Sequence, residues 1–89
     1  MKVLNITVNT KAKNEMVMNS GITLYPLKLI TKSFWGKINE VEAYPLSYGP
    51  TYGTNFIHHY QFVDGIGNEL SDDISKLCTN YCRTLSFKN

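Results

Sequence analysis

Two glutamates, Glu40 and Glu42, lie two residues apart in the stretch from 36 to 44. Alternate residues of a β-strand point to the same face, so both carboxylates share a face if this stretch is a strand. Paired carboxylates can perform general acid and base catalysis. The structural alternative is a solvated strand face, and we favour it because glutamate side chains are normally exposed.

The stretch that contains this pair reads Gly36-Lys37-Ile38-Asn39-Glu40-Val41-Glu42-Ala43-Tyr44. It resembles the strand of the 3-methyladenine DNA glycosylase family in which a glutamate activates water against a flipped base. The resemblance implies that Glu40 is that glutamate. It covers nine of the 89 residues, and the rest of the chain contains no counterpart of the family's other motifs. We therefore predict that the chain is not an enzyme and has no catalytic residues.

The cysteine and histidine side chains could form a metal site or provide a catalytic nucleophile. Cys78 and Cys82 lie four residues apart on an expected helix, while the adjacent His58 and His59 point to opposite faces of an expected strand and so cannot chelate one ion together. Cysteines on an apolar helix stripe usually serve as small core residues, and buried thiols are inert. We predict no metal, no cofactor and two reduced thiols, as in a cytoplasmic protein.

Three evenly spaced tyrosines, Tyr44, Tyr48 and Tyr52, lie in a segment whose prolines and glycines exclude a regular helix. This segment predicts a long aromatic loop from Tyr44 to Asn55. Tyrosine suits partner binding because it combines a large apolar ring with a hydroxyl group. The alternative is that the tyrosines pack together and close one end of a sheet.

Basic residues and the single tryptophan extend this candidate surface. Residues 1–44 carry six lysines against three acids, whereas residues 45–89 carry three basic and four acidic side chains. Trp35 lies between Lys32 and Lys37, and we predict that these three residues join the tyrosines in binding a partner. A second hypothesis is single-stranded nucleic acid, bound by Trp35, the tyrosines and lysines that include Lys11, Lys13, Lys28, Lys32 and Lys37.

Hydrophobic periodicity predicts the elements that position these residues. Alternation predicts strands at about 2–9, 15–18, 22–31, 34–44 and 55–63, with a turn at 19–21 and a break near Pro26. In the first strand Leu4, Ile6 and Val8 share a face. A helical stripe of Ile74, Leu77, Cys78, Tyr81 and Leu85 follows, with Ser71 as its cap. The predicted fold is α+β, a small antiparallel sheet of four to five strands with one C-terminal helix packed on a face.

Length and composition limit the class of protein. Eighty-nine residues predict one domain, residues 1–89, and 43% hydrophobic with 18% charged residues is typical of a globular chain. The N-terminus lacks the apolar run of a signal peptide, and no stretch is long enough to span a membrane. We predict a cytoplasmic location, which is the host cytoplasm if the gene belongs to a phage.

These observations favour a small, non-enzymatic binding protein. Small chains rich in lysine and asparagine are common in phages and mobile elements, so we expect a protein that docks on a host protein and inhibits or redirects it by steric occlusion through the aromatic loop. The alternative is a sheet-based binder of single-stranded nucleic acid or a nucleotide. An exposed sheet edge also allows pairing with a second copy, which makes a homo-oligomer compatible with the sequence.

Overall fold

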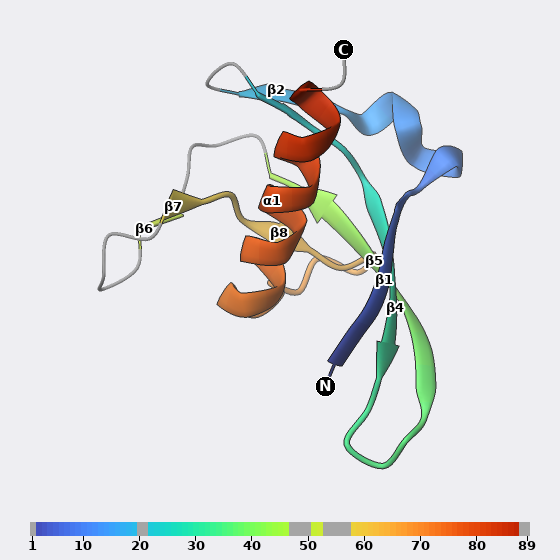
Figure 1. The fold of residues 1–89 in the computed structure, drawn as a ribbon. Coiled ribbons are helices and arrows are strands. Elements are labelled where there is room, and N and C mark those ends of the chain that lie inside the picture. Colours follow the sequence, from blue (N-terminus) through green and yellow to red (C-terminus); the bar gives the residue numbers. More distant parts are fainter. Residues whose placement is uncertain (1, 20–21, 47–50, 53–57, 88–89) are drawn as a thin grey trace.

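The computed structural model describes residues 2–19, 22–46, 51–52 and 58–87, which form an α+β fold. The main sheet is antiparallel with strand order β1-β4-β5-β8. Its strands are β1 (Lys2–Val8), β4 (Leu27–Lys32), β5 (Ile38–Pro45) and β8 (Phe62–Val63). One C-terminal helix, α1 (Asp72–Phe87), lies across one face of this sheet (Figure 1). The predicted fold class is confirmed.

Two smaller antiparallel pairs and a short 3-10 helix complete the described elements. One pair joins β2 (Val17–Asn19) to β3 (Ile22–Leu24), and the other joins β6 (Thr51–Tyr52) to β7 (His58–His59). The 3-10 helix, η1 (Thr10–Glu15), follows β1. The strand predicted over 22–31 is divided at Pro26, which is buried between β3 and β4, so the chain passes from one sheet to the other there.

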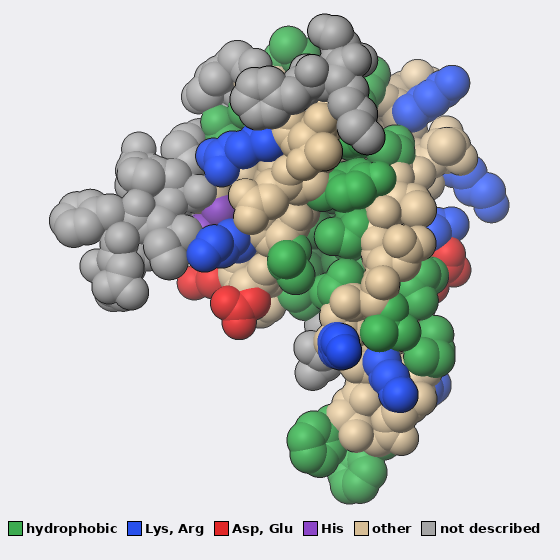
Figure 2. All heavy atoms as spheres, viewed as in Figure 1, with side chains coloured by type: hydrophobic (Ala, Val, Ile, Leu, Met, Phe, Trp, Pro, Cys, Tyr) green, Lys and Arg blue, Asp and Glu red, His purple; other side chains and the backbone are tan. Residues whose placement is uncertain are grey.

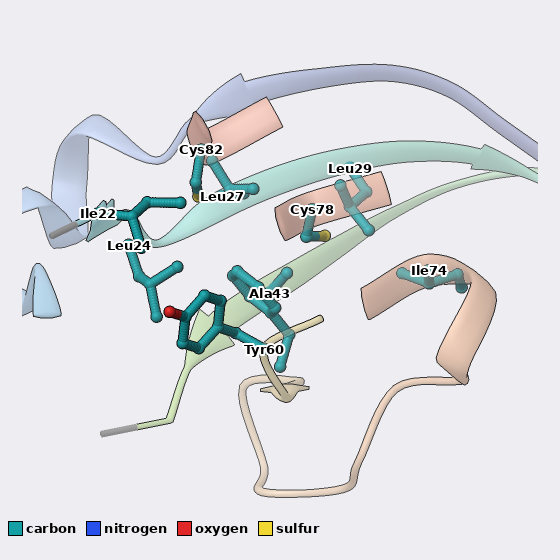
Figure 3. Close-up of a cluster of buried hydrophobic side chains, with 10 residues drawn as sticks. Ile22, Leu24, Leu27, Leu29, Ala43, Tyr60, Ile74, Cys78 and Cys82 are labelled. Atoms are coloured by element: carbon teal, nitrogen blue, oxygen red, sulfur yellow. The ribbon is translucent and has the colours of Figure 1, made fainter. Parts of the chain in front are cut away.

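The hydrophobic core fills the space between α1 and the sheets (Figure 3). Leu27 and Leu29 of β4 are fully buried, because alternate residues of a strand share a face and this face meets the helix. Cys78 and Cys82 of α1 are also fully buried. The remaining buried hydrophobic residues are Ile22, Leu24, Ala43, Tyr60, Phe62 and Ile74.

Polar groups of α1 are buried beside these cysteines. The Ser75 hydroxyl accepts a hydrogen bond from the backbone N–H of Phe62 at 3.3 Å, and the Thr79 hydroxyl accepts one from the N–H of Tyr60 at 2.9 Å. The predicted helical stripe is confirmed at Ile74 and Cys78, which are buried, and at Tyr81, which packs against the core. It is wrong at Leu77, which remains 46% exposed, and it does not include the buried Ser75 and Thr79. The prediction that Ser71 caps the helix is confirmed by a 3.4 Å hydrogen bond from the N–H of Ile74.

The register of β1 contains a bulge. Val3 pairs with Thr31 and Asn5 pairs with Ile30, so Leu4 is an extra residue between them. The bulge shifts the alternation, and Val3 joins Ile6 and Val8 as a residue packed against the core. The prediction that Leu4 shares the buried face is therefore wrong, since Leu4 is 46% exposed.

The predicted strand at 34–44 begins four residues later than expected, at Ile38, because Ser33–Lys37 form a turn. The predicted strand at 55–63 is represented by β7 and β8, with Tyr60 and Gln61 between them. His59, Tyr60, Gln61 and Phe62 are all buried, in agreement with a well-covered segment. Among the described residues, no helix is both long and apolar enough to cross a membrane.

Candidate functional site

The turn that joins β4 to β5 is fixed by three hydrogen bonds around Ser33. The Gly36 N–H donates to the Ser33 carbonyl at 2.9 Å, and the Ser33 N–H donates to the Lys37 carbonyl at 2.8 Å. The Lys37 N–H in turn donates to the Ser33 hydroxyl at 3.0 Å. Gly36 has φ +85°, which only glycine adopts without strain in such a turn. Phe34 and Trp35 therefore occupy the two central positions of a well-defined turn.

Both aromatic side chains at this turn are exposed to solvent. Phe34 and Trp35 are each 90% exposed, and their rings contact one another edge to face, with centroids 6.0 Å apart. Ile38, the first residue of β5, is a third exposed apolar side chain beside them. Figure 2 shows hydrophobic side chains at the end of the β4–β5 hairpin, which projects beyond the rest of the molecule. What we call the hairpin tip consists of Phe34, Trp35, Ile38, Lys2, Lys32 and Lys37.

The three lysines of the hairpin tip concentrate positive charge. Lys2 of β1 lies directly opposite Lys32 of β4, and Lys37 follows in the turn. Like charges opposite one another on antiparallel strands destabilise a sheet, so this pairing does not contribute to the stability of the fold. No acidic side chain pairs with these three lysines in the described part of the chain, whereas Lys28, further along β4, binds Glu40 with a 3.0 Å contact between Nζ and Oε1.

Trp35, Lys32 and Lys37 lie at the same turn, whereas Tyr44 does not join them, and the role of all four in binding a partner remains a prediction. Tyr44 lies near the other end of β5, six residues beyond Ile38, or roughly 20 Å at about 3.3 Å per residue. Tyr48 lies outside the described residues, and so does the side chain of Tyr52, whose backbone belongs to β6. The aromatic loop as a binding surface therefore remains a prediction.

The carboxylate pair lies on the face of β5 that is turned away from α1. Glu40 binds Lys28, and Glu42 accepts a hydrogen bond from the Tyr44 hydroxyl at 2.8 Å. This hydrogen bond to the carboxylate raises the pKa of Tyr44 above its usual value. Both glutamates are exposed, and each contacts a different neighbour, so the arrangement resembles an ordinary solvated strand face.

The described side chains considered for metal binding, those of His59, Cys78 and Cys82, are not assembled into a site, and the side chain of His58 lies outside the described residues. His59 is buried, and its Nε2 lies 3.7 Å from the carboxylate of Asp72. Burial raises the pKa of the thiols of Cys78 and Cys82 to about 12 and about 11, which disfavours the thiolates that a metal needs. Among residues 2–19, 22–46, 51–52 and 58–87, no three His, Cys, Asp or Glu side chains could hold an ion.

Three residues of the hairpin tip were not predicted from the sequence to belong to a binding surface: Phe34, Ile38 and Lys2. The spacing of Ser33 and Gly36, with two residues between them, is a turn signal that could have placed Phe34 at a loop. The position of Lys2 depends on the pairing of β1 with β4, which no local pattern specifies. Comparisons with protein-family models, curated proteins and solved structures find no match to this chain.

Proposed function

We propose that this chain is a non-enzymatic binding protein that docks on another protein through the hairpin tip. The observation that carries the proposal is the pair of adjacent aromatic side chains, Phe34 and Trp35, each 90% exposed at the end of a projecting hairpin. Such exposure does not stabilise the fold, because burial of apolar surface is what contributes to stability. Trp and Phe are enriched in the centres of protein interfaces, where they insert into apolar pockets.

The conformation of the hairpin tip favours binding because the tip is already ordered and loses little conformational entropy when it binds. Ser33 and Gly36 fix the turn, and the edge-to-face contact restrains the two rings. A preorganised aromatic pair loses less conformational entropy on binding than a flexible loop does. The tip also projects beyond the rest of the molecule, which suits insertion into a pocket of a partner protein.

The charge of the tip indicates the chemistry of that partner. Lys2, Lys32 and Lys37 lie at the strand ends and the turn that carry the aromatic pair, and none has an acidic partner in the described residues. The complementary surface is an apolar pocket with an acidic rim, and the lysines would steer its approach. Occupation of the pocket would act by steric occlusion, which requires no catalytic residue. The composition, rich in lysine and asparagine, suggests a phage or mobile-element protein, and the partner would then be a protein of the host cell.

Affinity capture with a matched surface control tests this proposal. The wild-type chain should retain one partner protein in stoichiometric amount from a lysate of the host cell. A variant with Phe34→Ser and Trp35→Ser should retain at least about tenfold less, since loss of a central aromatic anchor costs about 2 kcal/mol or more. Both residues are exposed, so the thermal unfolding midpoint should change little.

Ile66 provides the matched control. It is 85% exposed and lies in the separate turn between β8 and α1. The variant Ile66→Ser removes an exposed apolar side chain of similar accessibility but should capture the partner as the wild type does. Equal capture by the wild type and the doubly substituted tip would contradict the proposal.

A second candidate, single-stranded nucleic acid, is favoured by the combination of Trp35 with three lysines. Base stacking on Trp35 should quench its fluorescence, and it is the only tryptophan of the chain. Phosphate contacts would also make binding weaken steeply with added salt. We favour a protein partner because Phe34 and Ile38 add apolar surface and because the tip is not a groove that follows a nucleic-acid backbone.

A further inference from the structure

Strand β1 forms one edge of the main sheet in the described structure. It pairs with β4 on one side only. The other side of an antiparallel edge strand presents backbone N–H and C=O groups that can pair with another strand. Natural edges are commonly protected by charged residues, proline or a bulge. β1 has a bulge at Leu4, but residues 5–8 beyond it include neither a charged residue nor a proline.

At the opposite edge of the sheet, the backbone groups of Phe62 in β8 have hydrogen-bond partners within the chain. Strand β8 is covered by the chain that follows it, where the Leu70 N–H donates to the Phe62 carbonyl at 2.9 Å. The Ser75 hydroxyl of α1 accepts from the Phe62 N–H at 3.3 Å. The backbone groups of Phe62 are therefore satisfied within the chain. β8 pairs with β5 only at Tyr44 and Pro45, so residues 38–43 of β5 form an edge as well. That edge carries the charged Glu40 and Glu42, whereas residues 3–8 of β1 carry no charge, which favours β1 as the edge that accepts a further strand.

An apolar hollow of about 330 Å³ lies between β1 and α1. It is lined by Val3, Leu4, Asn5, Ile6, Leu77 and Tyr81. Two of these lining residues, Leu4 and Leu77, are both 46% exposed. Figure 2 shows hydrophobic side chains along the boundary between the helix and this strand. A strand added to β1 would cover part of this apolar surface while pairing with the backbone.

We propose that β1 pairs with β1 of a second copy in an antiparallel arrangement, so that two sheets become one. When Ile6 is placed opposite the Ile6 of the second copy, Asn5 lies opposite Thr7, and the paired stretch ends at the bulge formed by Leu4. Apolar side chains then meet apolar ones, and polar side chains meet polar ones. Lys2 lies beyond the paired stretch, so no like charges oppose one another. This self-complementarity is what a two-fold symmetric interface requires, and it favours a second copy over an unrelated strand.

A charge-reversal experiment tests the pairing directly. Asn5 and Thr7 are exposed and lie on the face of the sheet turned away from α1, so substitutions there should leave the core intact. One chain carries Asn5→Lys with Thr7→Lys, and another carries Asn5→Glu with Thr7→Glu. The mass in solution of each, and of an equal mixture, is measured by light scattering over a concentration series. Thermal unfolding establishes that each chain is folded.

The wild type should form a dimer as its concentration rises. Each charged variant alone should dimerise about tenfold more weakly, because like charges then face one another at both Asn5–Thr7 positions. The equal mixture should recover the dimer as a heterodimer. A control with Asn39→Lys and Asn68→Lys adds two positive charges away from β1 and should behave as the wild type.

A wild type that stays monomeric at the highest attainable concentration would overturn the inference. A dimer that both charged variants form as well as the wild type would overturn it too, since another surface would then be responsible. Neither result bears on the hairpin tip, because the capture experiment compares substitutions at 34 and 35 and does not depend on β1.

Discussion

Two buried thiols illustrate how the core determines the chemistry of single residues. Burial raises the pKa of Cys78 from 9.0 to about 12, with a further contribution from the nearby Cys82. Burial also raises the pKa of Cys82 from 9.0 to about 11, although its sulfur accepts a 3.4 Å hydrogen bond from the Tyr25 N–H, which acts in the opposite direction. The thiolate, which is the reactive form, is therefore scarce at neutral pH.

We predict that neither thiol reacts with a disulfide reagent in the folded protein at pH 8, whereas both react at once in denaturant. The absorbance of the released thiol gives the count and the rate. The pKa of each thiol is higher in the folded chain than in the unfolded chain. The two protonated thiols therefore contribute fully to the free energy of unfolding below pH 9, and this contribution is lost as the pH rises through about 11 to 12. Rapid modification of the folded chain at pH 8 would show that these side chains are accessible after all.

His59 offers a second prediction at this scale. Its side chain is only 4% exposed, and among the described residues neither ring nitrogen has a hydrogen-bond partner, since the carboxylate of Asp72 lies 3.7 Å from Nε2. A buried polar group without a partner costs about 1–3 kcal/mol, so His59→Leu should leave the free energy of unfolding unchanged or raise it. Chemical denaturation at pH 8 measures the change. A loss of more than about 2 kcal/mol would instead indicate that the imidazole makes a stabilising polar contact.

At the scale of elements, α1 accepts hydrogen bonds from backbone N–H groups of the segment at 60–62, as a neighbouring strand would. Ser75 and Thr79 lie one helical turn apart and accept hydrogen bonds from the N–H groups of Phe62 and Tyr60. Replacement by Ser75→Ala and Thr79→Val keeps most of the volume but leaves two buried backbone donors without partners. We predict a loss of about 2–4 kcal/mol in the free energy of unfolding.

The control for this prediction is Thr84→Val on the same helix. Thr84 is exposed, and its hydroxyl donates to the Asn80 carbonyl at 3.0 Å, so this substitution should change stability by less than about 0.5 kcal/mol. Urea denaturation of the three chains gives the comparison. Similar stability of the double variant and the Thr84 variant would show that these hydroxyl groups do not hold the segment.

The sequence predicts where the elements lie better than it predicts which of their residues are buried. Alternation in residues 2–8 and the helical spacing after Ser71 are local patterns, and both elements form as expected. The bulge at Leu4 and the burial of Ser75 and Thr79 depend on partners distant in sequence, namely β4 and the segment at 60–62. Such contacts override the local pattern, so local periodicity alone cannot indicate them.

The same reason explains why only part of the hairpin tip could be predicted. Trp35, Lys32 and Lys37 are neighbours in sequence, so composition is enough to group them. Lys2 joins them only because β1 is antiparallel to β4. Trp35 is more often a core residue, and its exposure follows from the turn at Ser33 and Gly36.

At the scale of the whole molecule, the two proposed surfaces are compatible. The hairpin tip lies beyond the start of β1, and α1 lies over the other part of the sheet (Figure 1). Antiparallel pairing of two β1 strands would direct the two tips to opposite ends of a dimer. Such a dimer presents two equivalent docking sites, and a partner with two pockets would be held more tightly than by either tip alone.

Site-specific photocrosslinking tests most directly whether the hairpin tip is the docking surface. A photoreactive amino acid replaces Phe34 in one chain and Ile66 in another, and both positions are exposed turn residues. After irradiation with the captured partner, a covalent product should form from position 34 and not from position 66. Crosslinking from position 66 alone, with none from position 34, would contradict docking through the tip.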